Sequence, residues 1–190
     1  MTTYVALLRG INLSGKNRIR MPELKNTFET LNLSRVETYI QSGNVVFDCE
    51  GIEPESLTGS IEKKISQSFG FTILVFLRDL DRLQGIIKSN PFFPEHQFQP
   101  EKLHISFLSK PPQNQGLNIS PHQVESRTSG KQHGDEFLVK GQEIYLVCPN
   151  GYGRTKFSNT YFERVMGVPA TTRNWKTINA LFEIAKQRQS

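Results

Sequence analysis

Basic side chains and glycines are interleaved in one segment near the N-terminus, between Arg9 and Arg20. Glycines let backbone N–H groups approach a ligand closely, and such loops can form concave anion sites. Lysine and arginine add charge-assisted hydrogen bonds to phosphate or carboxylate groups. The candidate binding residues of this segment are Arg9, Gly10, Asn12, Gly15, Lys16, Asn17 and Arg18. The segment is not a Walker loop, because Asn17 follows Lys16 where a serine or threonine is needed. A long strand-to-helix connection that uses glycine only for its turns explains the segment equally well.

A second group of basic residues lies in the C-terminal half. Arg154 and Lys156 precede a predicted helix that begins near Ser158, where free backbone N–H groups favour anions. Arg173 precedes the last predicted helix, and Asn174 is expected to cap that helix. We therefore count Arg154, Lys156 and Arg173 as candidate ligand residues. The simpler interpretation, in which these cations are solvated, is slightly favoured for Arg154 and Lys156.

Polar side chains surround a glycine in a predicted hairpin turn. Gln41, Ser42 and Asn44 carry amide and hydroxyl groups that can form hydrogen bonds with a ligand. A plainer role is favoured, in which Ser42 and Gly43 form a two-residue hairpin loop that sets the register of its strands. No nucleophile motif surrounds Ser42, so the sequence leaves the catalytic residues unknown.

The sequence gives no positive sign of a metal, a cofactor or an acid–base pair. The four histidines lack metal-ligand spacing, and Cys49 and Cys148 lie far apart along the chain. His104 alternates with apolar residues and is expected to be a half-buried structural residue. We therefore expect no metal and no cofactor, and leave open whether the protein is an enzyme.

Charge is distributed unevenly along the 190 residues, whose formal net charge is +5. The first 95 residues carry 11 basic and 11 acidic side chains, whereas the last 95 carry 12 and 7. This excess indicates an acidic partner only weakly. No apolar run approaches the roughly 20 residues that span a bilayer, and the N-terminus lacks a signal-peptide pattern. We therefore expect no membrane association and a cytoplasmic location.

The candidate residues must be positioned by short strands and amphipathic helices, whose order in the first half is β-α-β-β-α-β. The predicted strands are Tyr4–Arg9, Val36–Gln41, Asn44–Cys49 and Phe71–Leu77. One predicted helix begins at Pro22, and the other spans Glu53–Gly70. Gly70 is expected to end the second helix, because glycine adopts a positive φ without strain.

The second half repeats this order, with similar segments offset by about 95–99 residues. The predicted strands are Leu103–Leu108, Glu136–Lys140, Glu143–Cys148 and the extended Val168–Thr172. The predicted helices are Asn118–Ser129, Ser158–Gly167 and Trp175–Gln187. We predict an α+β fold of two ferredoxin-like (βαββαβ-type) units with antiparallel sheets and helices on one face, arising by internal duplication. The predicted domains are residues 1–90 and 91–190, with a boundary in the proline-rich segment Asn90–Pro100.

Five segments of the chain stand out as motifs: LLRGIN (residues 7–12), Gly15–Asn17, YIQSGN (39–44), Asn90–Phe92 and TTRNW (171–175). Together they resemble the motifs of one bacterial domain-of-unknown-function family of small cytoplasmic proteins. The resemblance covers essentially the whole chain and implies a pair of ferredoxin-like units, but no catalytic residue. Ser14 and Thr155 depart from the family pattern, where glycine and serine are usual.

The best interpretation is a protein that binds a phosphate-bearing ligand, such as a nucleotide, a sugar phosphate or a nucleic acid, at its basic glycine- and asparagine-rich surface. One alternative is a protein-interaction module that uses Phe71–Leu77 or Asn90–Pro100. Another is an enzyme acting on a small anionic substrate. Base stacking on the sheet is disfavoured, because the central strands lack the paired aromatic residues of an RNA-recognition sheet.

Overall fold

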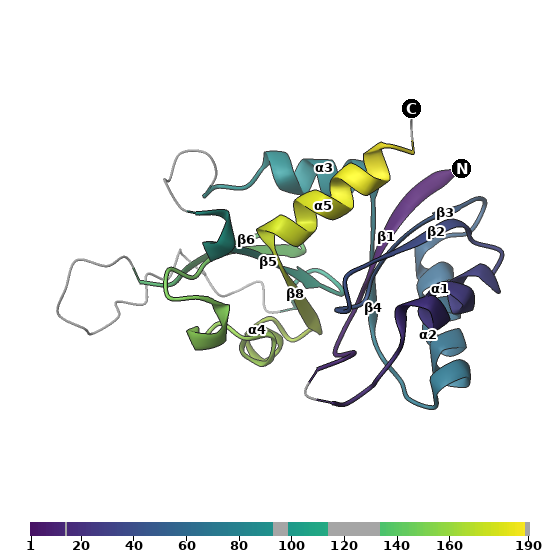
Figure 1. Cartoon of the computed structure of the whole chain (residues 1–190). Coiled ribbons are helices and arrows are strands. Elements are labelled where there is room, and N and C mark those ends of the chain that lie inside the picture. Colours follow the sequence, from purple (N-terminus) through teal and green to yellow (C-terminus); the bar gives the residue numbers. More distant parts are fainter. Residues whose placement is uncertain (14, 93–98, 114–133, 189–190) are drawn as a thin grey trace. The chain divides into compact units, whose positions relative to one another are not determined.

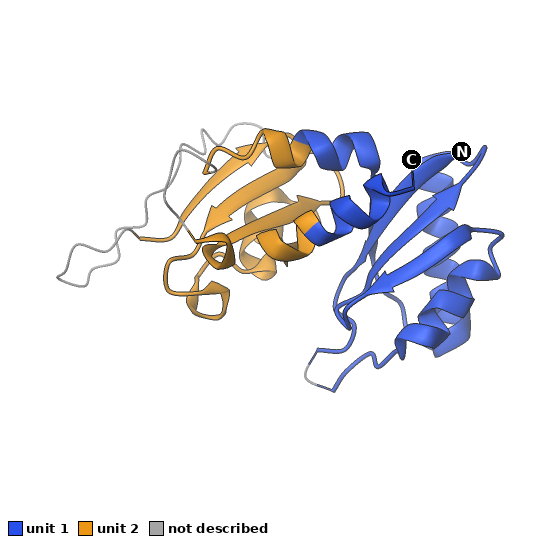
Figure 2. Cartoon of the chain, turned by 45° about the horizontal axis from the view of Figure 1, so that its top comes forward, with its two compact units in different colours: residues 1–85, 180–190 blue, residues 86–179 orange. Residues whose placement is uncertain are grey.

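The computed structural model describes residues 1–13, 15–92, 99–113 and 134–188, which divide into two compact units. Unit 1 comprises Met1–Gly85 and Ala180–Ser190, and unit 2 comprises Ile86–Asn179 (Figure 2). The division therefore falls within two helices, at Gly85 and at Asn179. The domain boundary expected in Asn90–Pro100 stays a prediction, and residues 93–98 of that segment lie outside the described residues.

Unit 1 contains a four-stranded antiparallel sheet with the strand order β2-β3-β1-β4 (Figure 1). Its strands are β1 (Thr2–Leu8), β2 (Ser34–Tyr39), β3 (Asn44–Cys49) and β4 (Val75–Asp79). Its helices are α1 (Met21–Glu29) and α2 (Pro54–Phe69), and α3 (Leu80–Lys88) begins in this unit. This is the predicted β-α-β-β-α-β order with the ferredoxin-like arrangement of strands.

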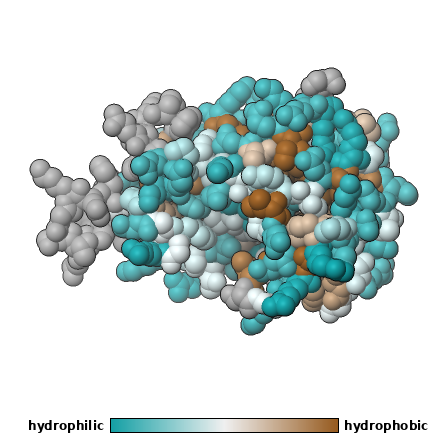
Figure 3. Space-filling view, in the orientation of Figure 1, coloured by the Kyte–Doolittle hydropathy of each residue, from teal (hydrophilic) through white to brown (hydrophobic). Residues whose placement is uncertain are grey.

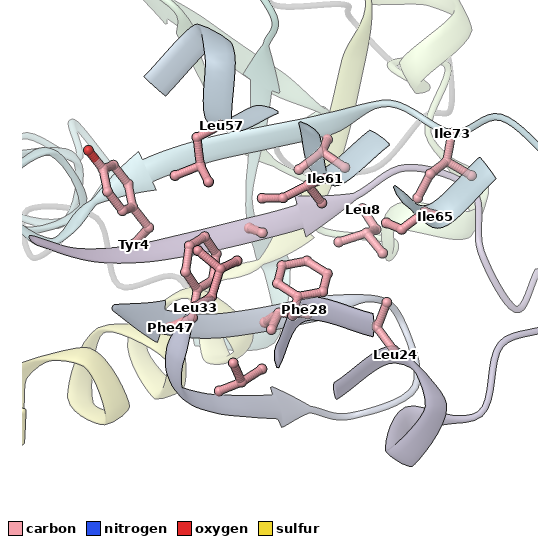
Figure 4. Packing of buried hydrophobic residues seen from close by; sticks show 14 of the residues in the cluster. Tyr4, Leu8, Leu24, Phe28, Leu33, Phe47, Leu57, Ile61, Ile65 and Ile73 are labelled. Carbon is pink, nitrogen blue, oxygen red and sulfur yellow. The ribbon is translucent and has the colours of Figure 1, made fainter. Parts of the chain in front are cut away.

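The core of unit 1 lies between the sheet and the two helices α1 and α2, which cover the same face (Figure 1). Side chains of β1 and β3 point toward Phe28 of α1 and toward Leu57, Ile61 and Ile65 of α2 (Figure 4). The spacing of four along α2 places its apolar residues on one side of the helix, which explains why the sequence pattern predicted it.

The other face of this sheet is also buried. Val5, Leu7 and Val46 alternate with the core residues along β1 and β3 and are at most 1% exposed. The C-terminal part of α5 (Trp175–Lys186) belongs to unit 1, and its residues Leu181 and Ala185 are fully buried. Burial of both faces explains why β1 is apolar at consecutive positions rather than alternating.

Two predictions for unit 1 were wrong. The strand expected at Phe71–Leu77 begins only at Val75, because its partner β1 ends at Leu8, which pairs with Val75. The hairpin loop between β2 and β3 has four residues rather than two, because Tyr39 pairs with Asn44. The extra length lets the turn contact another part of the chain, as described below.

Unit 2 has an equivalent antiparallel sheet with the order β6-β7-β5-β8. Its strands are β5 (Leu103–Leu108), β6 (Glu136–Lys140), β7 (Glu143–Val147) and β8 (Ala170–Asn174). Its other elements are α4 (Asn159–Met166), the start of α5 and the short 3-10 turns Pro100–Lys102 and Tyr152–Arg154. The last strand begins two residues later than predicted. The helix predicted at Asn118–Ser129 lies outside the described residues.

The core of unit 2 is rich in aromatic rings. The edge of Phe137 contacts Phe157 and Phe162, with ring centroids 4.7 and 5.3 Å apart. Ser158 caps α4 by accepting a hydrogen bond from the Tyr161 N–H at 3.2 Å, and Gly167 ends it with a φ of 73°. Both of these helix ends were predicted from the sequence.

The two units share several hydrogen bonds at corresponding positions. The first residue of the last strand donates to a helix glutamate in each unit: Val75 to Glu62 at 2.8 Å and Ala170 to Glu163 at 2.9 Å. Asp79 and Asn174 cap the following helices by accepting from backbone N–H groups at 2.7 Å. The predicted fold class, with its two units, is confirmed. These recurrences fit the internal duplication, which stays a prediction.

Within the part of the chain that the structure describes, no helix is both long and apolar enough to cross a bilayer.

Candidate functional site

A cleft of about 760 Å³ opens in unit 1, between the loop that follows β1, the start of α1 and the β2–β3 turn. This volume lies within the range of about 300–1,000 Å³ that is typical of small-molecule sites. We call it the unit 1 cleft. Its lining consists of Asn12, Gly15, Arg18, Ile19, Arg20, Met21, Pro22, Glu23 and Gln41. Four of the residues singled out from the sequence, Asn12, Gly15, Arg18 and Gln41, therefore meet at one place.

The Asn12 side chain ties three segments of this region together. Its amide nitrogen donates to the carbonyl oxygens of Ile19 and Gln41, both at 2.9 Å. Its amide oxygen accepts from the Ile19 N–H at 2.9 Å. Asn12 also has a φ of 53°, a left-handed conformation that asparagine tolerates better than most residues. Asn12 therefore fixes the shape of the loop and holds the hairpin turn against it.

Asn17 and two glycines complete the loop. The Asn17 amide nitrogen donates to the Gly10 carbonyl oxygen at 3.1 Å, and the Asn12 N–H donates to the Asn17 carbonyl at 3.1 Å. A tight turn is closed by the Lys16 N–H, which donates to the Leu13 carbonyl at 2.9 Å. Gly10 and Gly15 have φ values of 74° and 79°, so both positions favour glycine. The loop is thus held by its own asparagines before any ligand arrives.

The cations of the loop differ in their surroundings. Arg20 forms an ion pair with Glu23, whose Oε1 atom lies 2.9 Å from Arg20 Nε and 2.5 Å from Arg20 Nη2. Lys16 and Arg18 are exposed, and neither has an acidic partner within 4.0 Å among the described residues. Arg18 Nη2 lies over Gly15, 3.5 Å from the point where a Cβ atom would stand. Lys16 and Arg18 are therefore the cations of this loop that are available to an anion.

The β2–β3 turn contributes Gln41 to the cleft and uses its other polar residues internally. Asn44 is fully buried, and its amide nitrogen donates to the Tyr39 carbonyl at 3.1 Å and to Ser42 Oγ at 2.9 Å. Gly43 has a φ of 75°, and a Cβ atom there would stand 2.8 Å from atoms of Leu8 and Ile11. Only glycine fits this position, which explains why the turn packs so closely on the end of β1.

The other candidate residues lie in unit 2, which is described by itself. Arg154 and Lys156 are exposed. Arg173 is buried, and burial lowers the pKa of its guanidinium to about 10. Its Nη1 atom donates to Thr171 Oγ1 and to the Thr172 carbonyl, both at 2.9 Å. Arg173 thus has interior partners, unlike Arg154 and Lys156.

Residues 1–145 match a protein family that is described as a protein of unknown function (DUF1697). The chain belongs to this family. The predicted resemblance to a family of unknown function is confirmed. The comparison with curated proteins finds no similar sequence. Among solved structures, the chain is similar to a conserved bacterial protein, SP0830 from Streptococcus pneumoniae, with a TM-score of 0.71 and 21% sequence identity. The match covers 97% of this chain and 98% of that one, and at this identity it shows the fold alone.

Five lining residues of the cleft in this DUF1697 chain were not candidate ligand residues in the sequence: Ile19, Arg20, Met21, Pro22 and Glu23. The sequence pattern predicts only a helix start at Pro22 in this segment. The spacing of Arg20 and Glu23, three residues apart, was the available signal for their ion pair. No local signal could place this pair beside Gln41, because the contact depends on the folded turn.

Proposed function

We propose that the unit 1 cleft binds a small phosphate-bearing ligand through Lys16 and Arg18. The observation that carries the proposal is that these two exposed cations have no acidic partner among the described residues. Arg18 lines a cleft of about 760 Å³, and Lys16 stands on the same loop, next to the lining residue Gly15. Charge-assisted hydrogen bonds from such groups to phosphate oxygens are short and strong.

The rigidity of the loop supports this proposal. Three hydrogen bonds of the Asn12 side chain and one of Asn17 hold the backbone around Lys16 and Arg18. A preformed site loses less conformational entropy when its ligand binds. The asparagines that the sequence offered as ligand contacts therefore support binding by holding the cations in place.

A small ligand is favoured over a single-stranded nucleic acid. Proteins that bind single strands stack bases on exposed aromatic rings. In unit 1 the rings of Tyr4 and Phe47 stack on each other within the core, with centroids 6.0 Å apart. These rings are covered by the helices of the unit and are not available to bases.

The apolar segment Phe71–Leu77 does not offer the protein-binding surface that we considered. Ile73, Val75 and Phe76 are buried, and Phe71 and Leu77 pack partly against the unit 1 core. The face of the molecule shown in Figure 3 is mainly hydrophilic, with small separate apolar patches. A large apolar patch would have favoured a protein partner.

The proposal is tested by isothermal titration calorimetry with nucleotides, sugar phosphates and inorganic phosphate at low and high salt. We expect the double variant Lys16→Glu/Arg18→Glu to bind at least tenfold more weakly than the natural chain. The matched control, Lys63→Glu/Lys64→Glu, makes the same charge change on α2 and should keep the affinity. Equal affinities of the two double variants would overturn the proposal.

Arg154 and Lys156 are tested separately, since they lie in unit 2. If they bind the same ligand, the variant Arg154→Glu/Lys156→Glu loses affinity as well. If the unit 1 cleft is a complete site, this variant binds like the natural chain.

A further inference from the structure

The unit 1 cleft carries a negative group as well as its cations. Glu23 lines the cleft, and its Oε1 atom accepts two hydrogen bonds from Arg20, at 2.9 and 2.5 Å. Among the described residues only Arg20 donates to this carboxylate, through its guanidinium to Oε1 and more weakly through its backbone, so Oε2 keeps capacity to accept a hydrogen bond. The hydrogen bond from Arg20 lowers the pKa of Glu23, and a glutamate carboxylate is ionised near neutral pH in any case. One wall of the cleft therefore offers a hydrogen-bond acceptor.

This acceptor restricts which phosphate compounds suit the cleft. An ionised phosphate beside Glu23 would be repelled, so the phosphate must lie on the side of Lys16 and Arg18. The part of the ligand that reaches Glu23 must carry hydrogen-bond donors. A pair of neighbouring hydroxyl groups suits a carboxylate well, as in the recognition of ribose by acidic residues of dinucleotide-binding folds.

The same wall supplies apolar surface. Met21 and Pro22 lie between Arg20 and Glu23 in the sequence and line the cleft with them. Met21 is partly buried and Pro22 is exposed. A flat apolar group of a ligand can pack against these side chains, whereas a simple sugar phosphate has no such group.

From these three features, we propose that the ligand of the unit 1 cleft is a nucleoside monophosphate. Its phosphate lies on Lys16 and Arg18, its ribose hydroxyls donate to Glu23 Oε2, and its base packs on Met21 and Pro22. This inference rests on the proposed function and goes further by naming the ligand class and a residue that selects it. Glu23 is a specificity-determining residue in this arrangement.

The test compares ribonucleotides with their 2′-deoxy forms, because the two differ only in the hydroxyl that Glu23 is proposed to accept. The ligands are the 5′-monophosphates of adenosine, guanosine and cytidine, their 2′-deoxy forms, ribose 5-phosphate and inorganic phosphate, measured by calorimetry. We expect the natural chain to bind at least one ribonucleotide about tenfold more tightly than its deoxy form, which corresponds to the loss of one hydrogen bond to a charged group. Ribose 5-phosphate and inorganic phosphate should bind more weakly than that ribonucleotide.

Two variants separate the role of Glu23 from that of its ion pair. Glu23→Gln should bind the ribo and deoxy forms with equal affinity. Arg20→Gln breaks the same ion pair but keeps the carboxylate, so it should keep the preference for the ribo form. Circular dichroism checks that both variants are folded.

The possible failures are distinguishable. If phosphate compounds bind in a manner that needs Lys16 and Arg18, but the natural chain does not discriminate ribose from deoxyribose, the nucleoside inference is overturned and the proposed function stands. If Glu23→Gln keeps the preference for ribose, Glu23 does not select the ligand. If none of these compounds binds, both the inference and the proposed function fall.

Discussion

The turns between the second and third strands differ between the two units, although the strands themselves are equivalent. In unit 2, Gly141 and Gln142 form a two-residue loop, and the Gln142 carbonyl accepts from the Leu108 N–H at 2.8 Å. In unit 1 the loop has four residues, and the Gly43 carbonyl accepts from the Leu8 N–H, also at 2.8 Å. The same hydrogen bond thus anchors both turns to the end of the neighbouring strand.

The two additional residues of unit 1 give its turn a second contact. The carbonyl of Gln41 accepts from Asn12, which lies 29 residues earlier in the chain, and Gln41 lines the unit 1 cleft. Ile40, at the start of the turn, has a φ of 48°, which is rare for a β-branched residue and costs energy. A common sheet frame therefore tolerates different turns, and the longer, strained turn belongs to the unit with the cleft.

The largest effect is expected at Gly43, where the unit 1 turn packs on the end of β1. Gly43→Ala should lower the free energy of unfolding by about 3 kcal/mol, because its Cβ atom meets Leu8 and Ile11 at 2.8 Å and its φ is 75°. Urea denaturation measures the loss. Gly51→Ala is the control, since Gly51 has a φ of 70° but no atom within 4 Å of a Cβ there. It should lose only about 1 kcal/mol. Equal losses would mean that close packing does not fix the turn.

A second difference between the units concerns one position of the third strand. Asp48 of β3 is 1% exposed, accepts from Thr3 Oγ1 at 2.7 Å and from Arg35 Nε, and lies 4.0 Å from Arg188. The corresponding residue of unit 2 is the buried Val147. It pairs with Leu103 of β5, just as Asp48 pairs with Thr3 of β1.

Replacing Asp48 tests how much this buried charge, which unit 2 lacks, contributes to stability. Asp48→Asn should destabilise the protein by about 2 kcal/mol in urea denaturation, because it removes the buried charge that faces both Arg35 and Arg188 and leaves Arg188 with only the exposed Glu37. The exposed side chain of Arg35 keeps the loss below that of a fully buried pair. Glu37→Gln removes the exposed partner of Arg188 and should cost less than about 1 kcal/mol. A cost of Asp48→Asn no greater than this control contradicts the buried network.

A third substitution breaks the hydrogen bond that joins the β2–β3 turn to the loop after β1 in unit 1. Asn12→Ala removes three hydrogen bonds and should cost about 1.5 kcal/mol, a loss reduced by water that replaces some of them. Asn17→Ala removes one weaker hydrogen bond of 3.1 Å and should cost less. Calorimetric titration of Asn12→Ala should also show weaker ligand binding. Unchanged binding would show that the loop does not need Asn12 to present Lys16 and Arg18.

The smallest effect concerns an aromatic position that the units share. Tyr4 in β1 stacks on Phe47, and His104 at the same place in β5 stacks on Tyr152 with ring centroids 4.9 Å apart. Burial lowers the pKa of His104, which favours its neutral form in the folded state. Because the unfolded chain then binds protons more readily, stability falls as the pH drops below the ordinary histidine pKa of about 6.5.

His104→Tyr places the ring of unit 1 in unit 2 and removes this titration. The natural chain should therefore lose unfolding free energy relative to the variant as the pH falls from 7.5 to 5. Urea denaturation at several pH values measures it. A difference that stays constant with pH would show that His104 takes up a proton equally well in both states.

Local interactions are the part of the fold that the sequence predicted best. Gly70 and Gly167 end their helices with φ values of 78° and 73°, and Asn174 caps the last helix through the Thr177 N–H. Each of these depends on residues within one helical turn, so type and spacing suffice to predict them. The βαββαβ order followed for the same reason, because each element carries its own apolar period.

The site was less accessible to sequence reasoning, because its contacts join distant segments. Residue types alone identified Gly15, Lys16 and Arg18 as candidate ligand residues. They could not predict that Lys16 and Arg18 are exposed, whereas Arg173 is buried and donates hydrogen bonds to residues of its own strand. Residue types and their spacing predict which helices and strands form and which residues could bind an anion. The contact of Asn12 with the turn, and the meeting of Glu23 and Gln41 in one cleft, follow from the tertiary structure alone. These roles require segments far apart in the chain to meet, and the sequence pattern of one segment does not predict which distant segment it will contact.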